Sequence, residues 1–330
     1  MKVDAYATMD HWFDHAYALY KHLEPDHRGT FYMGSYDLCG AAGRNGTTAQ
    51  AIHPTRSDRP ILVASWRDAE RCLRVGRKVI LMEHGIGQSF VGTDNASYSG
   101  SSEHAKLAMR LVPNEYAAEA HRKALPRVPI AVIGCPKLDD LLTLAPVVKG
   151  PVALSNHWGD RTSVPEMGGA WYQWHTFYDA IPKAFPGALG HAHPKLWGRM
   201  NGRLSVMGFE PVPHFVDVCR RAEVYVCDGV STLYEFAALD RPVVVLNPPS
   251  FRRDVDHGGR FWTWADVGVQ VDDPNEITEA IDEARREQPT QVARRRAIGA
   301  EVYPHLGIAG LTGAQAIQAD FGRSSTINQP

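Results

Sequence analysis

The stretch that most constrains the fold lies between residues 222 and 249, AEVYVCDGVSTLYEFAALDRPVVVLNPP. Val224–Val226 combines β-branched and aromatic residues, which predicts a short buried strand. Apolar residues at helical spacing follow, Arg241-Pro242 ends that pattern, and Val243–Leu246 predicts a second buried strand. A strand, a helix and a strand in this order form a βαβ unit with parallel strands and a right-handed crossover. The chain is therefore expected to contain a parallel α/β sheet.

The turn between that first strand and the helix carries polar groups. Asp228-Gly229 breaks the strand, and Ser231 and Thr232 stand where the helix begins. Backbone N–H groups without helical partners and the positive end of the helix dipole coincide there, which suits the turn to bind phosphate. A second interpretation stays open, because Thr232 and Glu235 are also spaced as a capping box, which closes a helix start without any ligand.

Composition sets the class of protein. The chain has 330 residues, enough for two domains, with 44% hydrophobic and 22% charged residues, as in soluble globular enzymes. A formal net charge of −2 argues against a general basic surface for nucleic acid or anionic membranes. Five dispersed cysteines without CxxC spacing indicate reduced thiols and no zinc site, and no long apolar run or signal peptide is evident. We therefore expect a cytoplasmic protein.

Strands and helices alternate along both halves of the chain, which predicts two Rossmann-like domains. The Pro- and Gly-flanked segment near residue 148 is the best boundary, giving an N-terminal domain at 1–148, a C-terminal domain at 149–310 and a terminal helix with a frayed tail at 311–330. The predicted strands outside the βαβ unit are Lys2–Thr8, Gly29–Gly34, Pro60–Ala64, Lys78–Glu83, Pro129–Ile133, Val152–Ser155, Gly187–His191, Leu204–Met207 and Val267–Val271. No GxGxxG follows the first strand, which disfavours a dinucleotide-dependent dehydrogenase.

Polar residues follow several of these strands, where ligands bind in open α/β sheets. The strand Lys78–Glu83 runs into His84-Gly85-Ile86-Gly87-Gln88, whose glycines permit close approach of a substrate. We expect acceptor-binding or lid residues at His11, Gly85, Gly87 and Gln88. A strand-end histidine is also common as an ordinary polar loop residue, and that interpretation stays open.

Four segments together resemble the CDP-glycerol glycerophosphotransferases of teichoic-acid synthesis, which belong to the GT-B superfamily with the UDP-N-acetylglucosamine 2-epimerases. They are a His-Gly turn (84–85), a Gly-x-Pro-x-x-Asp segment (134–139), a His-Pro pair (193–194) and Asp-x-x-Ser-x-x-x-Glu-Phe-Ala (228–237). The resemblance covers roughly residues 78–281. It implies a GT-B architecture: two Rossmann-like domains facing across a cleft, with C-terminal helices packing back toward the N-terminal domain.

The resemblance also implies roles for single residues. His84 would be the general base at the acceptor hydroxyl or would lie beside the donor phosphates, and His193 would donate to the pyrophosphate. Ser231 and Thr232 would hold the diphosphate, and Glu235 would reach the ribose hydroxyls. The further donor-binding positions that we expect are Asp228, Arg161, Gly134 and Pro136.

Two motifs depart from the family. The chain has Asp228-Gly229-Val230-Ser231 where the family usually has Asp-Tyr-Ser-Ser, and Ile86-Gly87 where the His-Gly turn usually continues with Thr-Pro. The basic membrane-binding helices of a teichoic-acid polymerase are not evident. These departures bear on the donor and the acceptor more than on the fold.

The predicted function is a metal-independent transferase that moves a sugar or glycerol-phosphate group from a CDP- or UDP-linked donor to a hydroxyl acceptor, without a cofactor. The acceptor could be polymeric, such as a glycan or a polyol phosphate. Three alternatives remain: a non-hydrolysing UDP-sugar 2-epimerase, a glycosyltransferase acting on a hydroxymethylated base in DNA, and a nucleotide-sugar binding module without catalysis.

Three further patterns have structural as well as functional interpretations. His191-x-His193 could hold a metal, but no carboxylate or cysteine stands at ligand spacing. The arginines at 285–286 and 294–296 could guide a polyanionic acceptor, or form an ordinary ion-paired helix face. The aromatic residues of a predicted helix at Trp171–Phe185 could stack on bases or sugars, although a buried helix face explains them better.

Overall fold

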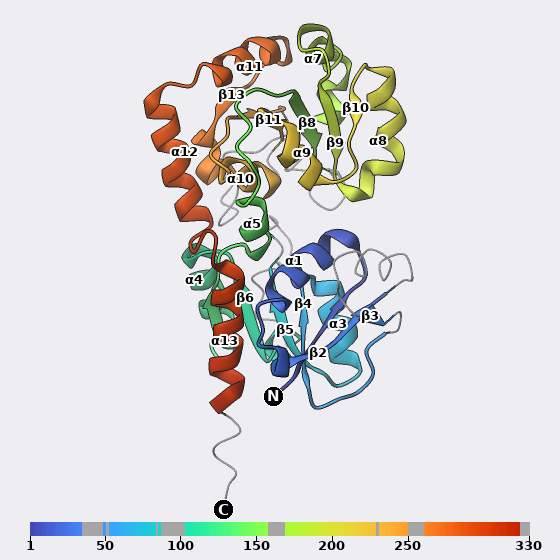
Figure 1. Cartoon of the computed structure of the whole chain (residues 1–330), viewed down its shortest axis with the longest axis vertical. Helices are drawn as coiled ribbons and strands as arrows, with labels where there is room; N and C mark the ends of the chain where they lie inside the picture. The colour runs from blue at the N-terminus through green and yellow to red at the C-terminus, as the bar shows by residue number, and fades with distance from the viewer. Residues whose placement is uncertain are drawn as a thin grey trace, which may run out of the picture. The chain divides into compact units, whose positions relative to one another are not determined.

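The computed structural model describes residues 1–34, 49–50, 53–83, 85–86, 103–157, 169–228, 231–249 and 261–323. These residues form two compact units (Figure 1). Unit 1 contains the described residues up to Asp140 and those from Tyr303 onward, and unit 2 contains those from Leu141 to Val302. The chain thus leaves unit 1 a few residues before the boundary expected at 148–149, and returns to it before the expected end of the second domain at 310.

Unit 1 is built on a seven-stranded parallel sheet with the order β3-β2-β1-β4-β5-β6-β7. The strands are β1 (Val3–Ala7), β2 (Arg28–Met33), β3 (Ala49–Gln50), β4 (Pro60–Val63), β5 (Lys78–Met82), β6 (Met109–Val112) and β7 (Ile130–Val132). The helices are α1 (Asp10–Tyr20), α3 (Trp66–Arg74), α4 (Glu115–Ala124), α5 (Pro136–Leu141) and α13 (Ala309–Arg323), with short 3₁₀ turns η1 (Pro25–His27) and η2 (His104–Lys106).

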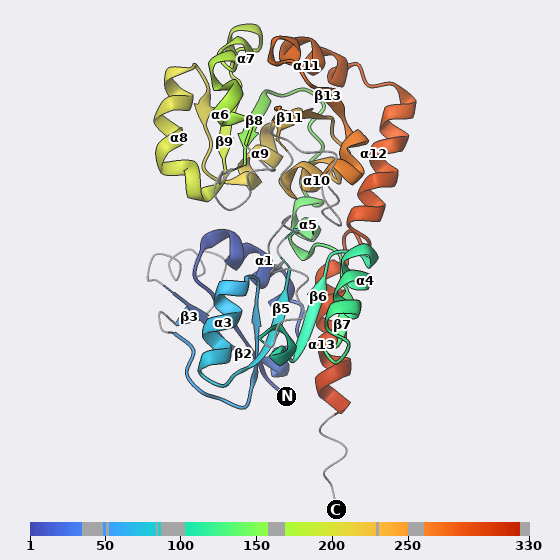
Figure 2. The same cartoon turned by 180° about the vertical axis from the view of Figure 1, so that it is seen from behind.

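Side chains of unit 1 alternate between two cores, as a parallel sheet covered on both faces requires. Ala5 and Ala7 of β1 face a core with Leu19 of α1 and Ile317 of α13. Tyr6, between them, faces the opposite core with the buried side of α3. Figure 2 shows α3 and α4 on the side of the sheet turned toward the viewer. The expected packing of a C-terminal helix onto the first domain is confirmed, because α13 lies against α1.

Unit 2 is built on a six-stranded parallel sheet with the order β10-β9-β8-β11-β12-β13. The strands are β8 (Val152–Asn156), β9 (Leu189–Ala192), β10 (Glu210–Pro211), β11 (Val224–Cys227), β12 (Val243–Leu246) and β13 (Val269–Val271). The helical elements are α6 (Trp171–Trp174), η3 (His175–Phe177), α7 (Ala180–Ala184), α8 (Pro194–Val206), α9 (Phe215–Arg221), α10 (Ser231–Ala237), η4 (Phe261–Val267), η5 (Pro274–Glu276), α11 (Ile277–Arg285) and α12 (Pro289–Val302).

The predicted βαβ unit is confirmed as β11, α10 and β12, with the two strands paired in parallel. Val224 and Val226 face the core that includes α7, α8 and α11. Tyr225 faces the other way and stacks on Phe236 of α10. The fold expectation of two parallel α/β layers is thereby confirmed.

Two local predictions in unit 2 are wrong. Leu204–Met207, expected as a strand, is the end of α8: Leu204 is buried whereas Val206 is 90% exposed, as the last turn of an amphipathic helix allows. The helix expected over Trp171–Phe185 is divided into α6, η3 and α7. Its aromatic residues Trp171, Trp174 and Tyr178 belong to the hydrophobic core, so the structural interpretation of that aromatic run is the correct one.

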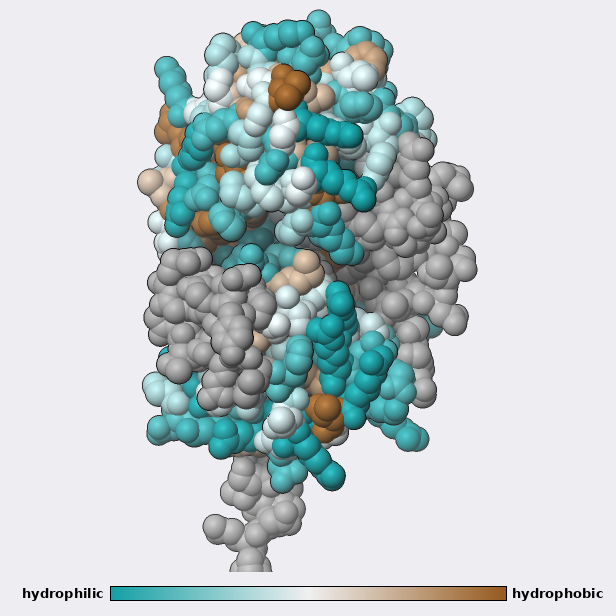
Figure 3. All heavy atoms as spheres, turned by 90° about the vertical axis from the view of Figure 1, so that its right-hand side faces the viewer, coloured by the Kyte–Doolittle hydropathy of each residue, from teal (hydrophilic) through white to brown (hydrophobic). Residues whose placement is uncertain are grey.

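Several large apolar side chains are exposed among the described residues. No helix among them is both long and apolar enough to cross a membrane. On the face shown in Figure 3, apolar residues appear as separate spots among hydrophilic ones. The large exposed apolar side chains include Val148, Val206 and Ile308, which come from separate elements.

Candidate active site

Three neighbouring strands of unit 2 end in polar residues at the same edge of the sheet. β8 lies between β9 and β11, with Asn156 opposite Ala192 and Ser155 opposite Cys227. The residues that follow these positions are His157, His193 and Asp228. The carboxyl ends of parallel strands are where open α/β sheets bind ligands, and we therefore take this edge as the candidate site.

Asp228 holds the backbone of this edge together. Its Oδ1 accepts the backbone N–H of His157 and its Oδ2 accepts that of Ala170, each at 2.6 Å. Its side chain is buried, and burial raises the pKa of Asp228 to about 7, although both backbone N–H groups favour the ionised form. Both carboxylate oxygens are thus engaged by the protein, which supports a role in shaping the site alongside the expected role in donor binding.

His193 stands between β9 and α8 and is the N-cap residue of that helix. Its backbone N–H donates to the Asn156 carbonyl oxygen at 3.2 Å. Its side-chain Nδ1 accepts the backbone N–H of Lys195 at 3.1 Å. The imidazole is half-buried, and its ring centroid lies 6.0 Å from that of His157 in an edge-on arrangement. Two histidines from adjacent strands therefore meet here, and sequence analysis had singled out only His193.

Asn156 is a second residue that sequence analysis did not select. Its side chain is fully buried, and its Oδ1 accepts the hydroxyl hydrogen of Tyr178 at 2.9 Å. Its Nδ2 is buried and has no hydrogen-bond partner in the part of the chain that the structure describes. A buried amide that lacks an acceptor costs free energy, and such exceptions are uncommon in folded proteins. The feature of the sequence that could have identified Asn156 is its position at the end of a predicted buried strand, next to a histidine.

The start of α10 does not form the capping box that the sequence allowed. The helix begins at Ser231, so Thr232 lies inside its first turn. The Thr232 hydroxyl lies 2.9 Å from the Tyr225 hydroxyl, and the two groups share a hydrogen bond. Glu235 is only 1% exposed. Ser231 and Thr232 remain partly exposed at the strand-end edge, as the phosphate-binding interpretation requires.

In unit 1 a buried polar network surrounds the end of β5. Glu83 Oε1 accepts from Arg110 Nη2 at 2.8 Å and lies 2.6 Å from His121 Nε2. Arg110 Nη1 is also 3.1 Å from Nδ1 of His104, whose ring stacks on Trp66 at a centroid distance of 3.7 Å. Glu83 Oε2 is buried, and none of the described residues forms a hydrogen bond with it.

The charges in this network perturb two pKa values. Burial opposes ionisation of Glu83, but the Arg110 charge and the hydrogen bonds from His121 and Arg110 outweigh it and lower the pKa of Glu83 to about 2. Burial and the nearby Arg110 charge lower the pKa of His104 to about 4. Glu83 is therefore a buried carboxylate that stays ionised directly before the predicted base.

Gly134 and Pro136, expected in donor binding, have structural roles in unit 1. Gly134 has a φ of +76°, and a Cβ at this position would lie 2.0 Å from the carbonyl oxygen of Pro304. Pro136 begins α5, whose Asp139 accepts the backbone N–H groups of Ala309 and Gly310 at 3.1 and 2.7 Å. This motif therefore anchors the start of α13, which accounts for its spacing without a ligand.

The remaining predicted site residues are placed as follows. His11 lies half-buried in α1 with its ring 5.0 Å from that of Trp12, and Gly85 is buried after β5. The predicted residues His84, Gly87, Gln88 and Arg161 lie outside the described residues.

The His191 side chain forms a hydrogen bond and packs against aromatic rings, and the structure does not place it as a metal ligand. Its Nδ1 lies 2.9 Å from the Val212 carbonyl oxygen, to which it donates, and its ring lies near Trp197 and Phe215. Among the described residues, no group of three or more His, Cys, Asp or Glu side chains is arranged to hold a metal ion.

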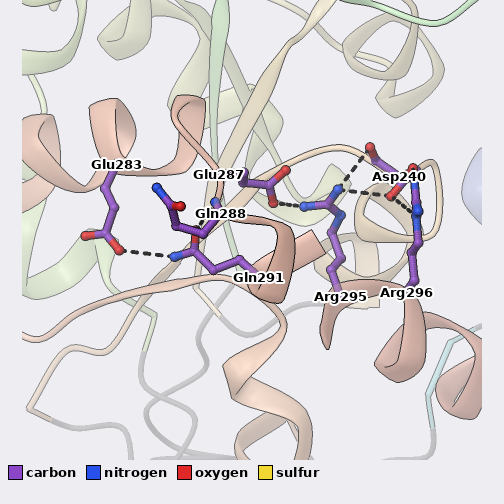
Figure 4. Close-up of polar contacts among 7 residues, drawn as sticks. All are labelled: Asp240, Glu283, Glu287, Gln288, Gln291, Arg295 and Arg296. Atoms are coloured by element: carbon purple, nitrogen blue, oxygen red, sulfur yellow. Dashed lines mark hydrogen bonds and ion pairs between the residues drawn. The ribbon is translucent and has the colours of Figure 1, made fainter. Parts of the chain in front are cut away.

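The arginines of α12 are paired with acids of unit 2. Figure 4 shows Arg295 between Asp240 and Glu287, with Arg296 on the other side of Asp240. Arg294 pairs with Asp266 at 2.6 Å. Because each positive charge has an acidic partner, this helix face is better explained as an ion-paired surface than as a track for a polyanion.

Comparison with known proteins supports the fold. No protein-family model and no curated protein sequence matches the chain. Among solved structures, S. aureus MnaA in complex with UDP matches with a TM-score of 0.65 at 11% identity, over 100% of this chain and 99% of that one. The wall teichoic acid polymerase TagF, in a form soaked with CDPG, matches with a TM-score of 0.64 at 12% identity, over 98% and 90%.

A third solved structure, a glycosyltransferase from Rickettsia africae, matches with a TM-score of 0.55 at 11% identity, over 98% of this chain and 99% of that one. All three likenesses extend over nearly the whole chain, and at this level of identity they establish the architecture alone. The chain has the two-unit α/β fold of GT-B type.

Proposed function

We propose that this protein is a metal-independent transferase that moves a sugar or glycerol-phosphate group from a nucleoside-diphosphate-activated donor to a hydroxyl acceptor. The observation that carries the proposal is His193 at the strand-end edge of unit 2. Its Nδ1 accepts the Lys195 N–H, so its Nε2 is the nitrogen that carries the hydrogen of the neutral ring. That N–H can donate to a phosphate oxygen, as the resemblance to the glycerophosphotransferases implies.

The proposed reaction needs two kinds of groups. The acceptor oxygen forms a bond to the transferred carbon or phosphorus, the bond to the leaving phosphate oxygen breaks, and the nucleotide departs with the electron pair. Histidine and backbone donors can stabilise the charge that develops on the departing phosphate, which is why the proposal needs no metal. The acceptor's proton goes to a base, which the resemblance assigns to His84, because histidine titrates near neutrality.

A UDP-sugar 2-epimerase is the second candidate, and one observation favours it. Glu83 supplies an ionised, buried carboxylate at the end of β5, with one oxygen that accepts no hydrogen bond from a described residue. The solved MnaA structure, bound to UDP, has the same fold. Formation of an epimerised sugar without any acceptor would distinguish this activity from transfer.

The other two alternatives have less support. A DNA-modifying glycosyltransferase would use a basic surface, and the arginines of α12 are already paired with Asp240, Asp266 and Glu287. A binding module without catalysis would not need the predicted base, and the chain retains both His84 and His193.

The decisive experiment is thermal unfolding with CDP, UDP, GDP, ADP and dTDP, each with a chelator present. A nucleotide that fills one native site at about 100 times its Kd adds roughly 2.7 kcal/mol of stability, which raises Tm by a few degrees. We expect one pyrimidine nucleotide to do so. The matching donor is then tested for turnover in wild type, His84→Ala, His193→Ala and the control His214→Ala, whose histidine is exposed on another helix.

We expect the two site variants to lose turnover and the control to retain it. Full activity in both site variants would remove the basis for the proposal. No shift with any nucleotide would mean that the strand-end edge is not a nucleotide site, and a shift that appears only when metal is restored would contradict the metal-independent mechanism.

A further inference from the structure

A cavity with a volume of about 180 Å³ lies at the amino-terminal edge of the unit 2 sheet. Its lining includes Val243, the first residue of β12, and Gly268, which directly precedes β13. The two strands are parallel, so their amino ends share one edge of the sheet. The candidate active site lies at the opposite, carboxyl-terminal edge, about 13 Å away along a strand of four residues. The cavity is therefore not part of that site.

The floor of the cavity is apolar. Val243, Val267 and Ala284 form it, and each of these residues is 2% exposed or less. An apolar cavity of about 150 Å³ can hold benzene, so the space here suits a ligand of about eight non-hydrogen atoms. Such a ligand gains affinity by placing an aliphatic group on this floor, because apolar surface is then removed from water.

Two side chains of opposite charge stand at the rim of the cavity. Glu287 contacts the buried Arg295 through Oε1 (Figure 4), and its side chain is 18% exposed. Arg294 has Nε and Nη2 at 2.8 and 2.6 Å from Asp266 Oδ2, and its side chain is 56% exposed. Within the described residues, neither side chain makes a further hydrogen bond. Oε2 of Glu287 and Nη1 of Arg294 are therefore available to a ligand.

We propose that this cavity binds a small zwitterion with an aliphatic side chain, namely an α-amino acid of about the size of valine. The ligand carboxylate pairs with Nη1 of Arg294, the ammonium group donates to Oε2 of Glu287, and the side chain lies on the apolar floor. A ligand with a single charge displaces water from both rim groups but pairs with only one of them, which lowers its affinity. The site is separate from the proposed reaction, and its test does not depend on transferase activity.

Saturation-transfer NMR titration of the full chain tests this assignment. The probe is L-valine, and three further probes each lack one of its parts: isovalerate has no ammonium group, isobutylamine no carboxylate and glycine no aliphatic side chain. We expect valine to bind with a Kd on the order of 1 mM, and each partial probe to bind at least about tenfold more weakly. A partial probe that binds as tightly as valine, or valine that does not bind at about ten times the expected Kd, would overturn the proposal.

A pair of rim variants distinguishes recognition by Arg294 from a structural role of its ion pair. Arg294→Gln removes the partner of the ligand carboxylate, and we expect it to weaken valine binding about tenfold or more. Asp266→Asn breaks the same ion pair but keeps the guanidinium, so valine should bind as tightly as before or more tightly.

The matched control is Arg286→Gln, which removes an exposed arginine outside the cavity lining and should leave binding unchanged. Both rim positions are more than half exposed, so we expect both variants to fold, and their Tm values check this. Equal losses in Arg294→Gln and Asp266→Asn would assign the effect to the ion pair and overturn the proposal. Unchanged binding in Arg294→Gln would overturn it too, because valine would then bind elsewhere.

Discussion

Two buried carboxylates follow strands of the two sheets, and their surroundings shift their pKa values in opposite directions. Glu83 has a guanidinium and an imidazole N–H within hydrogen-bond distance, and its pKa falls to about 2. Asp228 has only backbone N–H groups, and burial raises its pKa to about 7. A nearby full charge compensates the loss of hydration where dipoles alone do not.

The lowered pKa of Glu83 predicts a dependence of stability on pH. Because the folded pKa lies below the ordinary value of 4.5, Glu83 contributes stability above pH 4.5 that is lost as pH falls toward 2. The difference between these values corresponds to about 3 kcal/mol at neutral pH. Between pH 4.5 and 3, wild type should lose about 2 kcal/mol more of its unfolding free energy than Glu83→Gln.

Denaturant unfolding of both proteins at several pH values measures this loss. The control is Glu103→Gln, which removes a carboxylate that is half exposed and pairs with Lys106. Parallel pH profiles for wild type and Glu83→Gln would show that the network does not hold Glu83 ionised.

Candidate site residues could be predicted from the sequence only where a local sequence motif identified them. His193 could be predicted because the His-Pro pair at 193–194 is one of the segments that resemble the glycerophosphotransferases. Glu83 was not selected, because the partners that define it, Arg110 and His121, are 27 and 38 residues away. For the same reason, the sequence did not reveal that the Asp228 oxygens accept backbone N–H groups 71 and 58 residues away. The expected role of Asp228 in donor binding stays a prediction.

At the scale of elements, α13 depends on a cap supplied from far along the chain. Asp139 of α5 accepts two N–H groups from the first turn of α13, at Ala309 and Gly310. Asp139→Ala leaves both groups without an acceptor, which should cost about 1–2 kcal/mol and loosen the helix. Hydrogen exchange of the α13 amides measures this, and we expect faster exchange there than in α1.

The neighbouring Asp140 provides the control. Its side chain is 61% exposed and pairs with Lys21, and we expect Asp140→Ala to leave exchange in α13 unchanged. Equal protection of α13 in both variants would show that the two hydrogen bonds of Asp139 contribute nothing to holding the helix.

Helices and strands were predicted correctly where the apolar residues follow a single periodicity and a turn or proline marks the end of the segment. The β-branched runs at Val224–Cys227 and Val243–Leu246 could only be buried strands, and they are. The strand predicted at Leu204–Met207 is wrong because four residues with three apolar side chains fit the end of a helix as well as a strand. The capping box, which the sequence left open as an alternative to a phosphate site, would need Thr232 before the helix, whereas α10 begins at Ser231.

At the scale of the whole molecule, the two units differ in which parts of the chain form them. Unit 1 is formed by residues from both ends of the chain, and the described residues of unit 2 come from one continuous segment. Among the described residues, one hydrophobic core of unit 2 is made entirely of residues between Val152 and Ala284, within one continuous segment. A core of unit 1 includes Ala314 and Ile317 from the far end of the chain. The sequence predicted two parallel α/β domains. The predicted boundaries lie several residues after the observed ones, because no change of composition marks the ends of the units at Asp140 and Tyr303.

This difference predicts how fragments behave. Residues 141–302 expressed alone should unfold cooperatively in denaturant, because the core that contains Val152, Val226 and Ile281 draws on no residue outside this segment. Residues 1–140 alone lack α13 and expose the apolar side of α1, so we expect them to bind a hydrophobic dye. The comparison is circular dichroism and dye fluorescence of both fragments against the full chain. A compact 1–140 fragment that binds no dye would contradict the prediction.

The return of the chain to unit 1 also sets an order of events on the ribosome. Unit 2 can fold as soon as residues 141–302, a segment of 162 residues, have left the ribosome. Unit 1 can complete its core only after α13 has been made, although the strands of unit 1 were synthesised first. At about 5–20 residues per second, synthesis of the intervening segment takes roughly 8–32 s. During that interval the apolar face of α1 is a surface for chaperones, so the half of the protein that is made first is the half that matures last.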